Sequence, residues 1–432
     1  MRLITTPRAT CYRLAASGGP APTTTLAAGR VPRARHSGTL ARVTNLVCPG
    51  FRFAGVAAGI KADDRLDVGL IAADGVASAA AVFTRNRVAA APVALSRAIL
   101  TRSRGRVRGV VVNSGNANAC TGPRGLGDAR RMAALGREVC GGQALIASTG
   151  VIGRPLAMDR LESGIAAAGA ALDPDGFARF AEAIMTTDKR PKVAARDVAL
   201  GKRRVRLVGA TKGAGMIAPN MATTLTFIVT DAAVPPSALR SLVAAAVEPT
   251  FNAIAVDGDT STNDTLAVLA GGTGPASRRE LRTLGAALTD LLDELAHQLI
   301  ADGEGVHHVV TIDVRGARTS GDARAVARRV AISPLVKTAI SGGDPNWGRI
   351  LCAVGNAGVE LRPDRIALAI GGVPVVHRGA AVDGWDPAAV VAVMKTPAYA
   401  MTIDLGLGRA TARHLACDLS HDYVTINADY TT

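Results

Sequence analysis

The stretch Gly213–Phe227 reads GAGMIAPNMATTLTF and joins a glycine-rich turn to the start of a strand. From Leu225 to Val229, apolar residues recur at every second position, as in a half-buried strand. Thr223 and Thr224 lie where the loop becomes the strand. Threonine is favoured in strands and tolerated at their ends, so β-propensity alone accounts for the pair. The alternative interpretation is that one of the two threonines is a nucleophile.

Predicted helices and strands alternate on both sides of this stretch. Ser237 is placed to cap one helix, and leucines at helical spacing from Leu281 to Leu299 mark a longer one. Strands are predicted at Arg108–Asn113, Val205–Gly209, Leu225–Thr230 and His308–Val314. The alternation predicts a layered α/β protein.

The composition is that of a compact globular protein: 432 residues, 48% apolar, with 47 glycines. No apolar run reaches the roughly 18 residues that a membrane helix requires, so no membrane span is expected. The net charge of +15 could indicate a nucleic-acid partner, but only 3% of the residues are aromatic and the basic residues are spread along the chain. Neither a nucleic-acid partner nor a membrane is therefore expected.

The first part of the chain differs from the rest. Residues 1–50 contain seven arginines, and the first acidic residue is Asp63. This composition resembles an organelle transit peptide, but an over-extended bacterial start or a disordered arm has the same composition. We interpret residues 1–47 as a basic, disordered leader and expect a cytoplasmic protein, with an organelle matrix as the alternative.

The six cysteines form no C-x-x-C pair and have no regular histidine partner, so neither a zinc site nor a disulfide scaffold is indicated. Reduced, mostly buried thiols are expected. His307 and His308 are interpreted as residues at the entry of a strand rather than as metal ligands, because no third ligand is visible.

Several polar, glycine-rich loops separate the predicted elements. Such residues dominate ordinary turns, and none of these loops has the spacing of a phosphate-binding signature. The loops are NSGNANACTG (113–122), ASTGVIG (147–153), VDGDTSTND (256–264), DGEG (302–305) and SGGDPNWGR (341–349).

Seven motifs in this order carry a resemblance to a known family. They are IASTGVIG, IMTTDKRPK, KGAGMIAPNMAT, VDGDTSTND, DGEG, SPLVKTAISGGDPNWGRI and the terminal CDLSHDYVTINADYTT. Together they resemble the ornithine acetyltransferase family, also called glutamate N-acetyltransferase, from about Pro49 to Thr432. The resemblance implies a layered αββα sandwich similar to the N-terminal nucleophile hydrolases, and a chain that cleaves itself between Ala222 and Thr223.

Cleavage there divides the chain into an alpha chain, residues 48–222 after the leader, and a beta chain, residues 223–432. Thr223 then has a free α-amine, whose ordinary pKa of roughly 8 suits it as the general base for its own hydroxyl. Thr224 cannot be the nucleophile if the cut follows Ala222.

The resemblance also implies roles for further residues. Thr149 and Gly150 match the oxyanion pair, which stabilises the tetrahedral intermediate. The substrate contacts that it implies are Thr186, Lys212, Thr223, Glu304, Asn427 and Thr432. The implied reaction moves acetyl from N2-acetylornithine to glutamate by a ping-pong route, with no cofactor and no metal. Acetyl-CoA is a possible co-substrate for N-acetylglutamate synthesis, and an α2β2 heterotetramer is the implied assembly.

This sequence departs from the usual family pattern at three places beside the implied site. They are Thr224 after Met-Ala-Thr, Val306-His307-His308 after DGEG, and Lys189-Arg190 after IMTTD. Two alternatives to the transferase remain at this point. One is a self-processing aminopeptidase or amidohydrolase of the related fold, which would pass the acyl group to water; the other is a non-catalytic basic binding protein.

Overall fold

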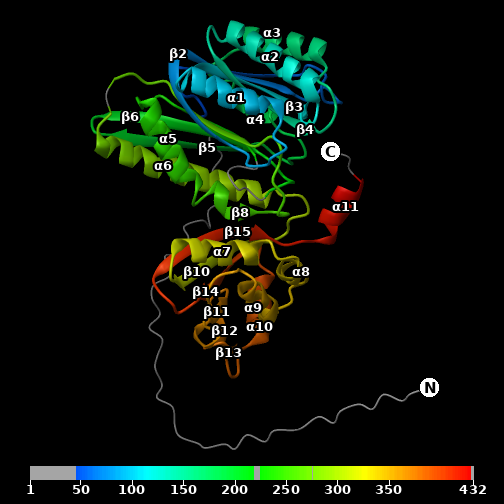
Figure 1. Ribbon diagram of the computed structural model, residues 1–432, viewed down its shortest axis with the longest axis vertical. Coiled ribbons are helices and arrows are strands. Elements are labelled where there is room, and N and C mark those ends of the chain that lie inside the picture. Colours follow the sequence, from blue (N-terminus) through cyan, green and yellow to red (C-terminus); the bar gives the residue numbers. More distant parts are fainter. Residues whose placement is uncertain (1–44, 218–223, 275, 430–432) are drawn as a thin grey trace, which may run out of the picture. The chain divides into compact units, whose positions relative to one another are not determined.

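The computed structural model describes residues 45–217, 224–274 and 276–429 (Figure 1). Two β-sheets with their covering helices make up this part of the chain, which confirms the predicted α/β class. The four predicted strands are all present, and the strand Leu225–Thr230 has the predicted bounds. The interpreted leader lies outside the described residues as far as residue 44, and so do Ala222, Thr223 and Thr432.

The first sheet has eight strands in the order β4-β3-β2-β9-β7-β6-β5, with β1 paired to β2. Their bounds are β1 Phe51–Val56, β2 Val68–Phe83, β3 Arg106–Asn116, β4 Ala144–Val151, β5 Lys192–Leu200, β6 Arg203–Lys212, β7 Leu225–Thr230 and β9 Thr265–Ala270. Within β2, Val68–Ala73 pairs with β1, whereas Ser78–Phe83 pairs with β9, and β3 pairs with β2 on both sides of a register shift. This shift, between Ala72 and Ala77, separates the two halves of the strand, so β2 belongs to two layers.

Three hydrophobic cores define these layers. Phe53, Val110 and Phe227 belong to the core between the two halves of the sheet. A second core packs α5 (Pro236–Val247) and α6 (Arg278–Ala301) against β5, β6, β7 and β9, and a third packs α2 (Gly122–Val139) and α3 (Met158–Ala170) against β2, β3 and β4. Figure 1 shows α2 and α3 on one side of the strands and α5 and α6 on the other. The expected αββα sandwich is therefore confirmed.

The helices of the sandwich are α1 Ala91–Arg102, α2 Gly122–Val139, α3 Met158–Ala170, α4 Phe177–Ala183, α5 Pro236–Val247 and α6 Arg278–Ala301. The predicted leucine stripe is buried along α6, and Ser277 caps that helix together with Glu280. The cap proposed at Ser237 is wrong. The helix begins at Pro236, because the fixed φ of proline suits the first helical position, and Ser237 lies inside the first turn.

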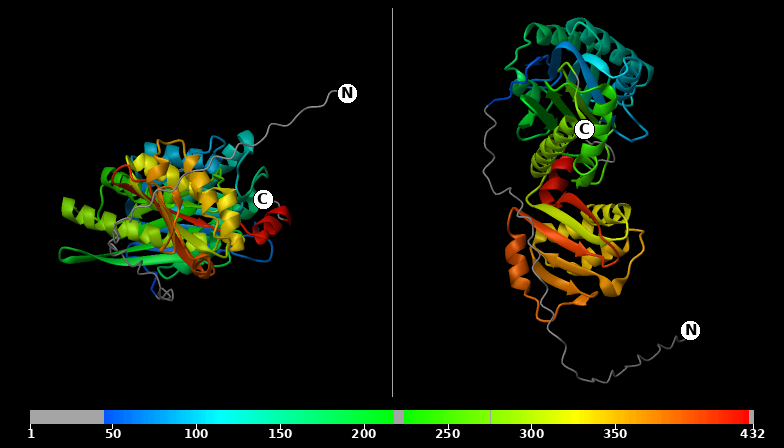
Figure 2. Two further views of the ribbon diagram at one scale, coloured as in Figure 1. Left: turned by 90° about the horizontal axis from the view of Figure 1, so that it is seen from below. Right: turned by 90° about the vertical axis from the view of Figure 1, so that its left-hand side faces the viewer.

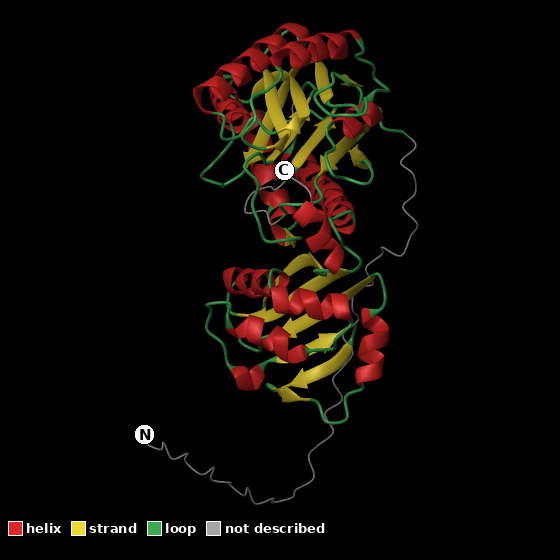
Figure 3. Ribbon diagram, turned by 90° about the vertical axis from the view of Figure 1, so that its right-hand side faces the viewer, coloured by secondary structure: helices red, strands yellow, loops and turns green. Residues whose placement is uncertain are grey.

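The second sheet has the order β13-β12-β11-β14-β10-β15-β8. Its strands are β8 Ile254–Ala255, β10 Val309–Ala317, β11 Ala367–Ile370, β12 Val373–His377, β13 Ala380–Ala381, β14 Ala398–Asp404 and β15 Ala410–Cys417. Its strands share one core with α7 Ser320–Ala331, α8 Pro334–Gly342, α9 Trp347–Gly355 and α10 Pro387–Met394, which lie beside the strands in Figure 2 and Figure 3.

Two segments connect this sheet to the sandwich. The short strand β8 follows a 3-10 turn, η1 Phe251–Ala253, and pairs with β15. Leu415 and Cys417 of β15 pack in the same core as α6. After β15, α11 (His421–Asp429) returns to the sandwich and brings Asn427 to Glu304.

Candidate active site

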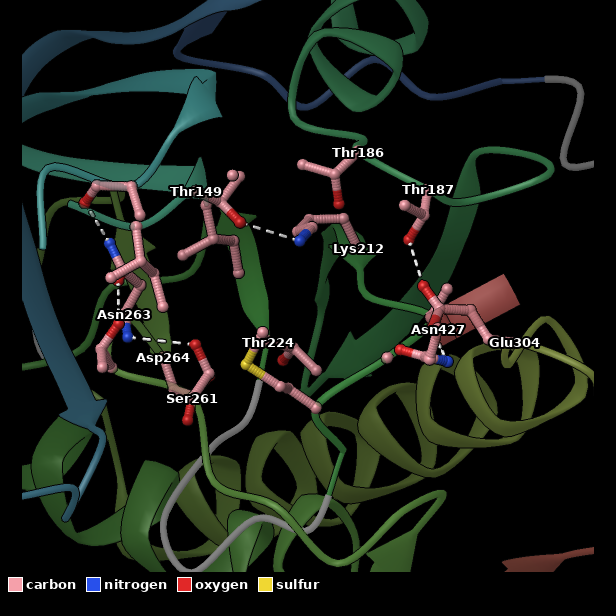
Figure 4. A pocket seen from close by; sticks show the side chains of 18 residues that line it. Thr149, Thr186, Thr187, Lys212, Thr224, Ser261, Asn263, Asp264, Glu304 and Asn427 are labelled. Carbon is pink, nitrogen blue, oxygen red and sulfur yellow. Dashed lines mark hydrogen bonds between the residues drawn. The ribbon is translucent and has the colours of Figure 1, made fainter. Parts of the chain in front are cut away.

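Four of the five polar loops meet around one cavity of about 100 Å³ at the ends of β4, β6, β7 and β9 (Figure 4). The first loop contributes Ala117, the second Thr149 and Gly150, the third the segment Ser261–Asp264, and the fourth Glu304. Of the implied site residues that the structure describes, all line this cavity: Thr149, Gly150, Thr186, Lys212, Glu304 and Asn427. Their convergence from distant parts of the sequence makes this cavity the candidate active site.

Thr149 and Gly150 lie at the end of β4. The Oγ1 atom of Thr149 accepts a hydrogen bond of 2.9 Å from the Nζ atom of Lys212. Gly150 has a φ of +129°, and a Cβ atom there would lie 2.3 Å from the backbone carbon of Gly115. Any side chain at position 150 would therefore collide with β3, so the close approach of the two strands requires glycine.

Lys212 ends β6 and is buried between the groups of the cavity. Burial lowers the pKa of its ammonium, although the carboxylates of Asp188, Asp264 and Glu304 oppose this effect. In Figure 4, Lys212 lies between Thr149 and Thr186. A buried cation at this place can hold an α-carboxylate or stabilise negative charge that develops beside Thr149.

Glu304 is held on both of its carboxylate oxygens. Thr187 donates to Oε1 over 2.8 Å, and the Nδ2 atom of Asn427 donates to Oε2 over 3.1 Å. Gly305 follows with a φ of +65°, and a Cβ atom there would lie 2.3 Å from the backbone nitrogen of Tyr423. The glycine therefore lets α11 approach closely enough for Asn427 to reach Glu304.

A buried charge network lies behind Thr186 and was not predicted from the sequence. The Nζ atom of Lys192 lies 2.5 Å from Asp188 and 2.6 Å from Asp302. The backbone N–H groups of Thr186 and Gly213 donate to Asp188 over 2.8 and 2.7 Å. Burial opposes ionisation of Asp188, but Lys192, Lys212 and the Gly213 N–H lower its pKa to about 2.

Asp264 is the second buried acid that the sequence did not single out. Burial raises the pKa of its carboxyl well above the usual range, although Lys212 opposes this shift. Its Oδ2 atom has no hydrogen-bond partner within the described residues. Asn263 fixes the segment by donating to the carbonyl oxygens of Ala117 and Ser148 over 2.6 and 2.8 Å. Asp264 thus presents a carboxyl that favours its neutral, proton-bearing form.

Thr224 is buried at the entrance to β7. Its Oγ1 atom lies 2.8 Å from the Oγ1 atom of Thr226, which in turn lies 2.7 Å from the Oγ1 atom of Thr211. The Thr224 hydroxyl therefore belongs to a buried chain of three hydroxyls.

The fifth loop does not reach the cavity. Ser341–Arg349 instead connects α8 to α9, where Gly343 ends one helix in the left-handed conformation and Asn346 caps the next. Its polar residues end α8 and begin α9, the two helices beside the second sheet, and they have no role at the candidate active site.

His307 and His308 directly precede β10, as predicted. Both backbone N–H groups donate to Asp418 over 2.9 Å. The His307 ring also lies 3.4 Å from Asp418 and 3.0 Å from Asp422 of α11. The unusual residues after DGEG thus hold the start of the helix that carries Asn427.

The described residues also bear on metal binding, thiol state and membrane insertion. No cluster of three or more histidine, cysteine or carboxylate side chains there has the arrangement of a metal site. The five cysteines among the described residues are free: Cys48, Cys140 and Cys417 are buried, and Cys120 and Cys352 are exposed. None of the helices in this part of the chain combines the length and apolar character needed to cross a membrane.

Comparison with known proteins places the chain in a family. Residues 52–432 match the ArgJ family. The chain is 46% identical over 386 residues to the arginine biosynthesis bifunctional protein ArgJ of Nitratidesulfovibrio vulgaris, covering 88% of this chain and 98% of that protein. It is also 46% identical over 391 residues to ArgJ of Geobacter sulfurreducens, covering 89% and 99%.

A crystal structure of an ornithine acetyltransferase from Mycobacterium tuberculosis, complexed with ornithine, is 39% identical to this chain. It covers 40% of this chain and 94% of that one, with a TM-score of 0.35. The two curated relatives match over almost their entire length, and the family match begins within β1 and continues to the last residue. This chain therefore belongs to the ArgJ family of bifunctional arginine biosynthesis enzymes.

Proposed function

We propose that this enzyme transfers acetyl from N2-acetylornithine to glutamate through an acetyl ester on Thr223. The observation that carries the proposal is the cavity that unites Thr149, Gly150 and Lys212 with Thr224, the residue bonded to Thr223. An acyl-transfer site needs a nucleophile, donors for the oxyanion and groups that hold the substrate. The cavity lining offers candidates for the oxyanion donors and the substrate contacts, and Thr223, bonded to the lining residue Thr224, is the proposed nucleophile.

Self-cleavage creates the nucleophile. The Thr223 hydroxyl attacks the Ala222 carbonyl carbon, the C–N bond breaks, and the nitrogen takes up a proton to become the α-amine. Water then hydrolyses the ester between Ala222 and the Thr223 oxygen. The freed amine serves as the general base that an ordinary threonine hydroxyl lacks.

Acetyl transfer follows in two half-reactions. The Thr223 oxygen attacks the acetyl carbon of acetylornithine, and ornithine leaves with the proton that the Thr223 amine had removed. Glutamate then attacks the acetyl ester through its α-amine and gives up a proton to the Thr223 α-amine. The ester bond breaks, and the Thr223 oxygen takes that proton to become a hydroxyl again. Both steps pass through a tetrahedral intermediate whose oxyanion requires donors.

The structure suggests how Thr149 provides one of these donors. Its oxygen accepts the Lys212 hydrogen bond, which leaves the hydroxyl hydrogen free to point at an oxyanion. The positive charge behind the hydroxyl also strengthens it as a donor. We assign the second donor to the backbone N–H of Gly150.

Substrate binding uses the charges on both sides of the cavity. Lys212 and Thr186 would hold an α-carboxylate, and Glu304, already fixed by Thr187 and Asn427, would receive the side-chain ammonium of ornithine. We also assign Thr432 to substrate binding. No step uses a metal or a cofactor; acetyl-CoA is proposed only as an alternative acetyl donor, and an α2β2 heterotetramer in the cytoplasm as the working form.

The test is to incubate purified enzyme with N2-acetylornithine and glutamate. Ornithine and N-acetylglutamate should form in equal amounts, and intact masses should show two separate chains, cut between Ala222 and Thr223. Acetate without N-acetylglutamate would instead identify the self-processing amidohydrolase. Replacing acetylornithine with acetyl-CoA shows whether the second donor is used, because free CoA then accompanies N-acetylglutamate.

A further inference from the structure

A second cavity, of about 190 Å³, lies where α7 and β15 meet the turn after α5. It shares no lining residue with the candidate active site. Its polar lining consists of Glu248, Asn252, Arg324, Arg328, Arg413 and His414. Arg324 and Arg328 are one helical turn apart on α7, so they belong to the same face of that helix.

His414 is the buried member of this group. It is 5% exposed, and its Nε2 atom has no hydrogen-bond partner within the described residues. Burial and the neighbouring charge of Arg328 lower the pKa of the ring to about 4, although a hydrogen bond with the Ile254 backbone opposes the shift. Burying a ring nitrogen without a hydrogen-bond partner is unfavourable, so the Nε2 atom marks a position where a bound ligand can supply the missing hydrogen bond.

The charges around the ring leave an excess of cations. Arg324 lies 3.4 Å from Glu248, and Arg413 pairs with Asp293 of α6 and lies near Asp313 of β10. The Asn252 side chain donates to the remaining oxygen of Glu248 over 2.9 Å. Arg328 forms no side-chain ion pair or hydrogen bond within the described part of the chain, so its guanidinium is available to a ligand.

We infer that this cavity binds an oxyanion, a phosphate or a carboxylate, between Arg328, Arg324 and His414, and that the histidine takes up a proton as the anion binds. Guanidinium groups match the paired oxygens of both anions. Both oxygens of Glu248 are already engaged by Arg324 and Asn252, so a bound anion adds a negative charge that favours the protonated ring, and the protonated Nε2 can then donate to that anion. Binding is therefore linked to proton uptake.

Sulfate is the suitable probe, because its own charge does not change between pH 5.5 and 8. Calorimetric titration of the full chain at constant ionic strength, in buffers of different ionisation enthalpy, gives both the affinity and the number of protons bound. We expect tighter binding at pH 5.5 than at pH 8, with net proton uptake. Phosphate and malonate at one pH then distinguish tetrahedral from planar ligands.

The matched pair of variants is Arg328→Gln and Arg329→Gln, since the two arginines are adjacent on α7 but only the first lines the cavity. Arg328→Gln should weaken sulfate binding about tenfold or more, whereas Arg329→Gln should leave it unchanged. His414→Gln should remove the proton uptake; Arg328→Gln still decides if that variant does not fold. The inference is overturned if both arginine variants weaken sulfate binding equally. It is also overturned if titration with sulfate releases no more heat than titration with sodium chloride.

Discussion

Replacing Thr149 with valine isolates the proposed oxyanion donor. Valine keeps the shape of threonine but removes the hydroxyl that accepts from Lys212 and that would donate to the oxyanion. Loss of one such donor typically costs about 3–4 kcal/mol of transition-state stabilisation, or roughly 100- to 1,000-fold in rate. Because Thr149 is 8% exposed and Lys212 is 9% exposed, little water can replace the lost group, so we expect the upper part of this range.

The substitution also leaves the Nζ atom of Lys212 without an acceptor on that side. A buried donor that loses its partner costs about 1–3 kcal/mol of stability, so the variant should unfold at a lower denaturant concentration while keeping its fold. Thr149→Ser is the matched control. It keeps the hydroxyl and loses one methyl group, worth about 1 kcal/mol of burial, and should retain most of the activity.

The assay is steady-state acetyl transfer from acetylornithine to glutamate, with kcat and KM measured separately on cleaved enzyme. A donor used only in the transition state should lower kcat and kcat/KM together. The proposed self-cleavage would pass through its own oxyanion, so the uncut chain should persist longer on a denaturing gel in Thr149→Val. Turnover within about threefold of the unchanged enzyme would refute the assignment, because the expected loss is far larger.

Further predictions concern the nucleophile and the buried acids. Thr223→Ala should give one uncut chain near 44.1 kDa without transferase activity, whereas Thr224→Ala should still be cut and yield a fragment beginning Thr-Ala-Leu; a Thr224→Ala chain that stays uncut would move the nucleophile to Thr224. Because the folded pKa of Asp264 is raised, stability should fall as pH rises above its unfolded pKa of about 3.9, and Asp264→Asn should remove this slope in urea unfolding. A loss of about 3–5 kcal/mol in Asp264→Asn would instead show an ion pair with Lys212. The folded pKa of His414 is lowered, so its contribution of about 3 kcal/mol is present above pH 6.5 and lost towards pH 4; a His414→Gln variant with the same acid-induced loss contradicts this.

Much of the fold follows from local patterns. Alternation predicts the strand Leu225–Thr230, and leucine spacing from Leu281 to Leu299 predicts the helix that the structure bounds at Arg278–Ala301. The long strand β2 was not predicted, although it joins the two layers. Its sequence VGLIAADGVASAAAVF is rich in alanine and glycine, which have low β-propensity, and only its partners on both sides make it a strand.

The sequence likewise indicated some residues of the candidate site and missed others. Motif resemblance brought out residues of the cavity that lie far apart in sequence, such as Thr149, Lys212 and Glu304. It missed Lys192, because lysine is usually exposed; here it is buried only because Asp188 and Asp302 both contact it. Asp264 was missed because VDGDTSTND has the composition of an exposed turn, whereas the two hydrogen bonds of Asn263 bury the end of that loop.

The ion pair of Lys192 with Asp188 and the buried carboxyl of Asp264 bear on how the α-amine of Thr223 could act as a base. An amine accepts a proton only when neutral, and a nearby full charge would shift its pKa away from working pH. The Asp188 carboxylate is already engaged by Lys192, while burial disfavours the charged forms of both Lys212 and Asp264. The ion pair of Asp188 and Lys192 thus lies behind the cavity, while Asp264 in the lining favours its neutral form. A neutral Asp264 places no negative charge in this lining, so it would not raise the pKa of a free amine on Thr223, the residue bonded to Thr224, above the ordinary value near 8 that a general base requires.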